Sequence, residues 1–556
     1  MNLLKNIPSK YILLYIVIIG FLLRVNNLMI GFPQLFVSND EAIYHLSALN
    51  MLANKTPLTI GNYGPLGAYI QIPFILLSFL TLKFSGVVNS VKDLEILLVT
   101  QEGYLLFIPR IISVLFGTLS ILVTYKLAQI LFNNKKVALW ASFFFAASFN
   151  LVHISHQARP WSGAIFFALI SVFFAIKSLK DNENKNTLLA FMFAAVAFGL
   201  HQIAGIVVAL IILVRFFGDS GRVISKINLV GIFSFLILAI VFNFFSLGSK
   251  FITVLTDQNH VGLIKIPSNF HSLQGIFNYY ISNSSFYKVI HDLILSDGIV
   301  FLFSIIYFLS YPKNRLVWAF IIFTTLNLLI ISVIFPPFLR YFLISIASMP
   351  IFAGRMVVDL FEKGKFKKIS AFLFGLTIVM ISSFNVVYWN LLILREPTFN
   401  QVRKWLDNNI APQTPIASTQ IRNFGYVPTA TASEPVRKFK PGYYSRTSKL
   451  LDNRYPLNVR NVIYVDQFGD KSKTENLNKA LLVYPVAYVV DSYLGSYDRL
   501  YTHYYGTKLK LIAHFSPTGD RIYDTKIPEL LFDAPYVFPL FVVDRAGPYF
   551  DVLKVE

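Results

Sequence analysis

The chain has 556 residues, of which 55% are hydrophobic and only 14% are charged. Soluble proteins carry charge on about a quarter of their residues, so this composition excludes an ordinary soluble enzyme. The formal net charge is +20, but Lys and Arg residues are spread through short loops, which argues against a nucleic-acid-binding protein. The absence of cysteine excludes disulfides, thiolate metal sites and cysteine nucleophiles.

Apolar runs long enough to cross a bilayer recur up to about residue 390 and then stop. If the N-terminus is cytoplasmic, the loops rich in Lys and Arg fall on the cytoplasmic side, as the positive-inside rule requires. The apolar segment 65–84 would reverse this pattern if it spanned, so we expect it to lie along or dip into the outer surface. We predict eleven spans, at 11–31, 106–132, 137–153, 161–177, 187–202, 204–217, 227–247, 297–311, 316–335, 341–356 and 369–390.

The sequence therefore predicts an α-helical polytopic membrane protein with a C-terminal extracytoplasmic α/β domain. The membrane domain covers 1–390, with outer loops at about 32–105 and 248–296. The remaining 391–556 opens with a helix-like run at 399–410 and continues with short strand-like runs, "NVIYVD", "AYVVDSY" and "KLIAHF". The first apolar run has no small-residue cleavage site after it, which indicates an uncleaved anchor in the cell membrane.

Ionisable residues collect on the predicted outer side of the membrane. Such residues are costly at membrane depth and usually face a cavity or a partner, so one shared polar cavity would account for them. Arginines beside Pro and aromatic residues on this side indicate an anion, because guanidinium binds phosphate bidentately and keeps its charge in apolar surroundings. A lipid phosphate fits this position. The residues are Asp40, Glu41, Tyr44, His153, His156, Arg159, His201, Arg340 and Tyr341.

Structural roles are the alternative for several of these residues. Ser38 and Glu41 have the spacing of a capping box that opens a helix. Both readings can hold together, since such a helix places Asp40 and Tyr44 one turn apart on the same face. Histidines at helix ends more often pack or anchor than bind a ligand. His156 and His201 are therefore only candidate substrate-binding residues.

Five motifs, taken in order, resemble the GT-C membrane glycosyltransferases: "NDEAIY", "GPLGAY", "PRIISVLFGTLSILVTYKLAQILF", "SHQARPW" and "LRYFLISIASMP". The branch that they resemble contains protein O-mannosyltransferases and lipid A aminoarabinose transferases. The resemblance implies transfer of a sugar from a polyprenyl phosphate to a lipid, glycan or protein acceptor on the outer face. It implies a general base at Asp40 and an acceptor-side or positioning role for Glu41. It also implies contact with the donor phosphate by Tyr44, Arg159, Arg340 and Tyr341.

The chain departs from this family at one place that bears on metal binding. The aminoarabinose transferases carry a Glu-Lys pair before the Pro-Leu of the first loop, and here Asn62 and Tyr63 precede "GPL". We therefore predict no metal site and no firm cofactor, and leave a divalent cation open. We expect inversion at the anomeric carbon, with one carboxylate sufficient because phosphate is a good leaving group. The alternative function is a transporter or lipid-linked sugar flippase, in which internal repeats are common; the sequence shows none.

Overall fold

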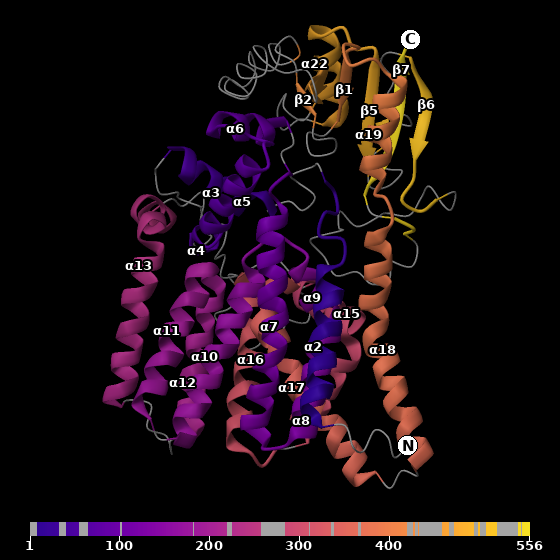
Figure 1. Ribbon diagram of the computed structural model, residues 1–556. Helices are drawn as coiled ribbons and strands as arrows, with labels where there is room; N and C mark the ends of the chain where they lie inside the picture. The colour runs from indigo at the N-terminus through magenta and orange to yellow at the C-terminus, as the bar shows by residue number, and fades with distance from the viewer. Residues whose placement is uncertain are drawn as a thin grey trace.

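The computed structural model describes most of the chain, and the account below concerns only that part. A bundle of long helices carries a small β-sheet unit at one end (Figure 1). Asp40 lies outside the described residues, and so does the side chain of Glu41. The described residues are 8–32, 41–54, 65–100, 103–181, 183–218, 225–256, 284–310, 312–334, 338–364, 368–419, 426–428, 432, 459–465, 472–493, 499–500, 508–519, 543–545 and 547–556.

Each of the eleven ranges predicted to span the membrane contains helix, although α2 ends at Val25 and residues 26–31 of the first range form turns. In the described part of the chain, eight helices are long and apolar enough to cross, or nine if one bent pair counts as a span. The polytopic helical fold is therefore confirmed. The bundle consists of α2 (Ser9–Val25), α7 (Phe107–Phe132), α8 (Lys135–Ala147), α9 (Phe149–Ser155), α10 (Trp161–Asp181), α11 (Asn184–Leu200), η1 (Gln202–Ile206), α12 (Val207–Gly218), α13 (Lys226–Thr256), α15 (Ser284–Leu309), α16 (Arg315–Ile334), η4 (Leu339–Phe342), α17 (Leu343–Lys363) and α18 (Lys368–Leu394).

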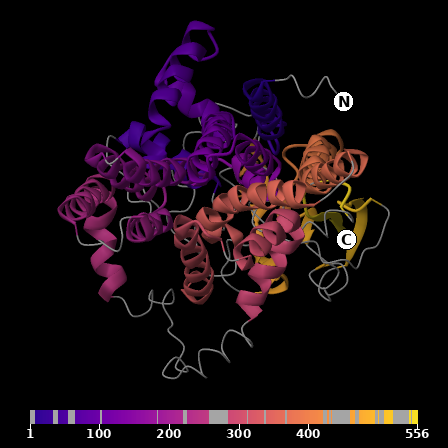
Figure 2. The same cartoon turned by 90° about the horizontal axis from the view of Figure 1, so that it is seen from below.

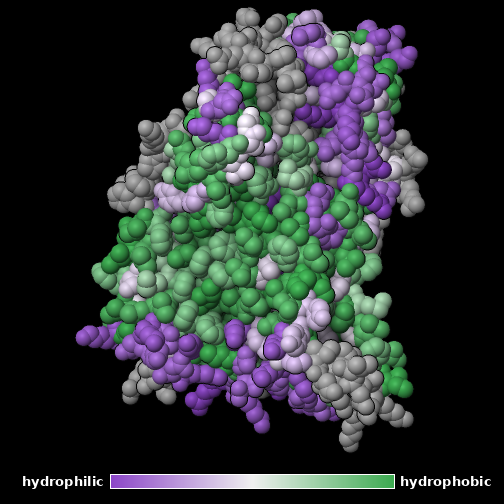
Figure 3. All heavy atoms as spheres, in the orientation of Figure 1, coloured by the Kyte–Doolittle hydropathy of each residue, from purple (hydrophilic) through white to green (hydrophobic). Residues whose placement is uncertain are grey.

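The outer surface of the bundle suits a lipid environment. Figure 3 shows a hydrophobic band across the middle of the visible face, with hydrophilic residues gathered at both ends. Large apolar side chains such as Phe233 and Val241 on α13 and Met380 on α18 are more than half exposed. Contiguous exposed apolar surface of this kind is a sign of a membrane or binding surface. Figure 2 shows α18 at the edge of the bundle on the side of the sheet.

Four shorter helices lie at the end of the bundle that carries the sheet (Figure 1): α3 (Glu41–Asn54), α4 (Leu66–Tyr69), α5 (Ile72–Phe84) and α6 (Val91–Thr100). They share a small core that includes Tyr44, Ala48, Ala68 and Ile75. The segment 66–84 is apolar enough to span by length and composition. Its position along the outer surface remains a prediction.

Two further predicted spans differ in detail from the structure. The span predicted at 137–153 is two helices, α8 and α9, bent by 55° at Ser148. The span predicted at 297–311 starts too late, because α15 begins at Ser284 and bends at Asp297, where φ is −129° and ψ is 38°. At this bend the amide of Asn385 on α18 donates to the carbonyls of Leu295 and Ser296. Both bends place polar groups inside otherwise apolar runs.

The C-terminal unit is the predicted α/β fold. Its sheet has the strand order β4-β1-β5-β7-β6, in which β1 is parallel to β4 and β5, and β7 is antiparallel to β5 and β6. The helix and the three strands expected from the sequence are all present, while the domain boundary at residue 390 remains a prediction. The elements are α19 (Thr398–Asn409), β1 (Ile416–Ser418), β2 (Val427–Pro428), β3 (Val459–Arg460), β4 (Val462–Tyr464), α22 (Lys473–Val483), β5 (Tyr488–Tyr493), β6 (Leu509–Phe515) and β7 (Tyr549–Val555).

A buried aromatic cluster joins this unit to the bundle. Trp389 and Ile393 of α18 pack in one core with Phe149 of α9 and with Tyr493 and Tyr549 of the sheet. The rings of Tyr493 and Tyr549 stack with centroids 5.3 Å apart. Aromatic side chains bury large areas, so this cluster fixes the sheet against the bent region of the bundle.

Candidate functional site

The helix that follows the "NDE" motif contacts the loop that carries Arg159. Tyr44 is almost fully buried in α3. A Cβ atom added at Gly67 would lie 2.9 Å from Cδ1 of Tyr44 and 3.0 Å from Cβ of Pro160. Gly67 therefore lies between Tyr44 and Pro160, and its lack of a side chain permits this close approach. The start of α3 is thereby placed beside the loop before α10.

A second link runs from α3 through Gln71. The side-chain amide of Gln71 donates from Nε2 to the carbonyl of Gly67 at 2.9 Å. Its Oε1 therefore faces His45, whose Nδ1 lies 3.3 Å away and donates to it. Burial lowers the pKa of His45 to about 4, while the hydrogen bond to Gln71 opposes this shift. His45 is thus a neutral imidazole near neutral pH, with its tautomer fixed by Gln71.

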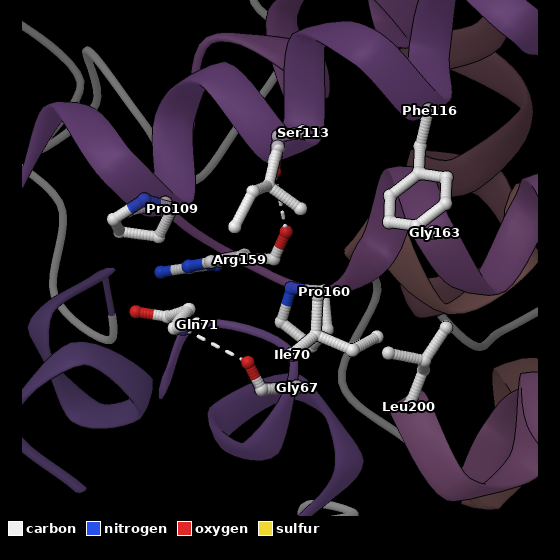
Figure 4. Close-up of a pocket in the computed structure, with 12 residues that line it drawn as sticks. Gly67, Ile70, Gln71, Pro109, Ser113, Phe116, Arg159, Pro160, Gly163 and Leu200 are labelled. Atoms are coloured by element: carbon white, nitrogen blue, oxygen red, sulfur yellow. Dashed lines mark hydrogen bonds between the residues drawn. The ribbon is translucent and has the colours of Figure 1, made fainter. Parts of the chain in front are cut away.

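Gln71 and Arg159 line one small pocket (Figure 4). About 20 Å³ of it is open to the centres of water-sized molecules, which is enough for a water-sized group. The figure shows the Arg159 side chain extending between Pro109 and Gln71. The hydroxyl of Ser113 on α7 donates to the backbone carbonyl of Arg159 at 2.7 Å, which fixes this loop against α7.

The second predicted arginine lies close to the same place. His201 stacks on Trp161 with ring centroids 3.6 Å apart, and Trp161 meets Tyr341 edge-on at 6.2 Å. Trp161, which follows Arg159 by two residues, therefore joins His201 to Tyr341, the neighbour of Arg340. The Arg340 guanidinium also lies 5.3 Å from the ring centre of Tyr341, in a cation–π contact. Three segments far apart in sequence thus meet at one end of the bundle.

His156 has different neighbours from His201. Its Nδ1 lies 3.0 Å from the carbonyl of Val152, and its ring packs near Trp389 at 6.4 Å. The two candidate substrate-binding histidines therefore have different neighbours.

Two further arginines are buried inside the bundle. The exposed fractions of Arg24 and Arg110 are 0% and 2%. Arg110 donates from Nη1 to the carbonyls of Leu28 and Ile30 at 2.6 Å and 2.8 Å. Both residues are therefore structural groups inside the protein, bound to backbone carbonyls.

Two charged side chains of opposite sign stabilise the helix ends that meet at the bend between α8 and α9. Arg24 donates to the carbonyls of Phe145 and Ala146 at 3.1 Å and 3.2 Å, at the C-terminal end of α8. Asp297 accepts from the backbone N–H of Phe149 at 2.8 Å and from Nδ2 of Asn150 at 2.7 Å, at the N-terminal end of α9. A cation at a helix C-terminus and an anion at an N-terminus both match the helix dipole. The sequence gives one indication of this bend, because the polar Ser148 and Asn150 interrupt an apolar run.

The roles predicted for Asp40 and Glu41 remain predictions, because Asp40 and the side chain of Glu41 lie outside the described residues. Among the residues that the structure describes, no group of three His, Asp or Glu side chains could hold a metal ion. The geometry that the structure does describe concerns Tyr44, Arg159, His201, Arg340 and Tyr341.

Residues 103–246 match the family model described as dolichyl-phosphate-mannose-protein mannosyltransferase. This match confirms the resemblance to GT-C membrane glycosyltransferases that the motifs indicated. The matched segment covers about a quarter of the chain and includes His156, Arg159 and His201. No curated protein matches the sequence.

Solved structures give weaker likenesses. The Archaeoglobus fulgidus oligosaccharyltransferase in the apo form is 12% identical, with 88% of this chain and 70% of that chain covered and a TM-score of 0.49. ArnT from Cupriavidus metallidurans bound to undecaprenyl phosphate is 13% identical, with 90% of this chain and 95% of that chain covered and a TM-score of 0.47. These TM-scores are too low for the likenesses to assign a function.

Proposed function

We propose that this chain is an integral membrane glycosyltransferase that moves a sugar from a polyprenyl-phosphate donor to an acceptor on the outer face of the membrane. One observation carries the proposal: Trp161, two residues after Arg159, stacks on His201 and meets Tyr341, the neighbour of Arg340, at the end of the bundle where α3 meets the "ARP" loop. The mannosyltransferase family match over 103–246 supports the reaction class.

The donor phosphate binds between the two arginines in this proposal. Arg159 is 4% exposed, and an anion beside a buried guanidinium is attracted strongly because little water screens the two charges. Guanidinium groups bind phosphate oxygens bidentately, so a phosphate suits this place better than a neutral ligand. Tyr341, in contact with Arg340, adds a hydroxyl beside the same anion. The isoprenoid chain of the donor would lie in the bilayer.

Asp40 is the proposed base, with Glu41 as an acceptor-side or positioning group. Tyr44 stands four residues after Asp40 in the sequence, and it packs beside Pro160, the residue after Arg159. The acceptor hydroxyl gives its proton to Asp40 while its oxygen bonds to the anomeric carbon. The bond from that carbon to the phosphate oxygen breaks, and polyprenyl phosphate leaves with its charge stabilised by the arginines. One displacement inverts the anomeric configuration.

We also propose that the sheet unit is extracytoplasmic and that the protein lies in the cell membrane. The connections from α7 to α8, from α10 to α11 and from α15 to α16 lie at the end of the bundle opposite to the sheet (Figure 1). The exposed Lys135 and Lys185 lie in the first turns of α8 and α11, and the exposed Lys313 lies just before α16. Hydrophilic residues crowd this end of the molecule in Figure 3. The positive-inside rule assigns such an end to the cytoplasm.

The test uses the full-length protein in lipid nanodiscs with a panel of radiolabelled polyprenyl-phosphate sugars. We expect label from one donor to move onto extracted cell-surface material. Asp40→Asn should abolish transfer and leave binding of polyprenyl phosphate intact, while Glu95→Gln, a control carboxylate in the same predicted loop, should transfer normally. Undiminished transfer by Asp40→Asn would remove the base assignment. A wild-type protein that neither binds nor consumes any donor would refute the enzyme and favour the transporter or flippase.

A further inference from the structure

His45, the residue after Tyr44, is fully buried but uses only one of its two ring nitrogens. Its Nδ1 donates to Gln71, so Nε2 carries no proton and can only accept. Nε2 is buried and has no hydrogen-bond partner within the described structure. Buried polar atoms in native proteins are nearly always paired, so an orphaned acceptor at this position needs an explanation.

The orientation of His45 is set by two successive hydrogen bonds. Gln71 is held by the carbonyl of Gly67, and Gln71 in turn holds Nδ1 of His45. A purely space-filling role would be served by an apolar residue without the cost of burying an imidazole. The arrangement instead keeps one lone pair fixed in direction.

The surroundings of His45 connect it to the proposed catalytic site. Gln71 lines the pocket that also contains Arg159 (Figure 4). The neighbouring Tyr44 packs beside Gly67 and Pro160. His45 therefore lies on the helix that leads from the proposed base and is bonded to a residue beside the proposed phosphate-binding arginine.

We propose that Nε2 of His45 accepts a hydrogen bond from a hydroxyl group of a substrate. This inference rests on the proposed function and names a contact within it. An unprotonated nitrogen and a phosphate oxygen are both acceptors, so the ligand atom cannot belong to an ionised phosphate. The two sources of a hydroxyl in the reaction are the transferred sugar and the acceptor.

Two substitutions separate the two ring nitrogens. His45→Gln places an amide near the position of Nε2, and His45→Asn places one near the position of Nδ1. If Nε2 binds a hydroxyl, His45→Gln should retain most of the transfer activity and His45→Asn should lose about tenfold in kcat/KM, the usual effect of one hydrogen bond. If His45 only supports Gln71, the order reverses, and that result overturns the proposal. Melting temperatures identify a variant that fails to fold.

Further measurements identify the hydroxyl and separate the possible failures. If Nε2 contacts the transferred sugar, a donor without the contacted hydroxyl should react more slowly with the wild type. The same donor should cause no further loss of activity in His45→Asn. If Nε2 instead contacts a hydroxyl of the acceptor, His45→Asn should slow transfer to the acceptor and leave the rate of donor hydrolysis by water unchanged. If removal of divalent cations reproduces the His45→Asn defect, Nε2 binds a metal and the hydroxyl assignment is wrong. An active wild type with equally active Asn and Gln variants refutes only this inference, whereas an inactive wild type refutes the proposed function.

Discussion

Replacing Asp297 by Asn tests whether the bent span depends on a charge supplied by another helix. The carboxylate of Asp297 accepts hydrogen bonds from Oγ of Ser148, from N of Phe149 and from both N and Nδ2 of Asn150. The substitution keeps the size of the side chain but exchanges one acceptor oxygen for a donor. Any effect therefore comes from hydrogen bonding and charge rather than from a cavity.

The expected cost follows from these contacts. Oδ2 serves Ser148 and both nitrogens of Asn150. The new amide is best oriented with its oxygen towards Asn150, so the N–H of Phe149 loses its acceptor and faces an NH2 group. Hydrogen bonds to charged groups contribute about 1.5–3 kcal/mol each, and loss of the anion at the N-terminus of α9 adds up to about 2 kcal/mol. We expect a destabilisation of about 3–5 kcal/mol, in line with the cost of breaking a buried charge interaction.

Hydrogen exchange measures this effect where it arises. In Asp297→Asn, the amides of Phe149 and Asn150 should exchange at least about 100-fold faster than in the wild type, because each 1.4 kcal/mol is a factor of ten. Ser304→Ala on the same helix removes a neutral hydroxyl that donates to Val300 and Met349, and should cost only about 1 kcal/mol. Unchanged exchange in α9, or an equal effect of both substitutions, would show that the charge of Asp297 does not hold the bend.

Three further predictions concern stability. The pKa of His45 is about 4 in the folded protein and 6.5 in the unfolded chain, so the unfolded state binds more protons as the pH falls through this range. Lowering the pH from 7 to 5 should therefore reduce the free energy of unfolding by about 2 kcal/mol. Unfolding measurements on His45→Gln should show a pH dependence that is smaller by this amount. Gly354→Ala would place a Cβ 2.7 Å from N of Ala141 and 2.9 Å from O of Val137; the strain should cost about 1–3 kcal/mol, and an unchanged melting temperature would contradict it. Arg460 donates to two carbonyls at the C-terminal end of α19; Arg460→Met should speed proteolysis of the C-terminal unit, and wild-type resistance would exclude this role.

Local patterns predicted the elements well because each one depends on its own residues. Apolar length identified the helices of the bundle, and alternation with turn residues identified β4, β5 and β6. The sequence analysis grouped Tyr44 with Arg159 and Arg340 because the charges of the loops put all three on the same predicted side of the membrane. The roles of Asp40 and Glu41 remain predictions, because they rest on a resemblance and lie outside what the structure describes.

Non-local pairing explains what the sequence did not predict. Arg24 lies 122 residues before its carbonyl partner Ala146, and Asp297 lies 149 residues after Ser148. A buried Arg and an interfacial Arg look alike in sequence, since both stand at the end of an apolar run. The link between His45 and Gln71 was missed for a related reason, because neither residue belongs to a recognisable motif.

The bend between α8 and α9 constrains how the protein can be made. At usual synthesis rates, on the order of ten seconds separates Ser148 from the emergence of Asp297 at the ribosome. Until Asp297 is inserted, the N-terminal end of α9 lacks its hydrogen-bond acceptor, so the first half of the chain cannot complete its fold in the bilayer. Separately expressed halves cut before residue 297 should therefore depend on insertion factors or chaperones until the missing half arrives.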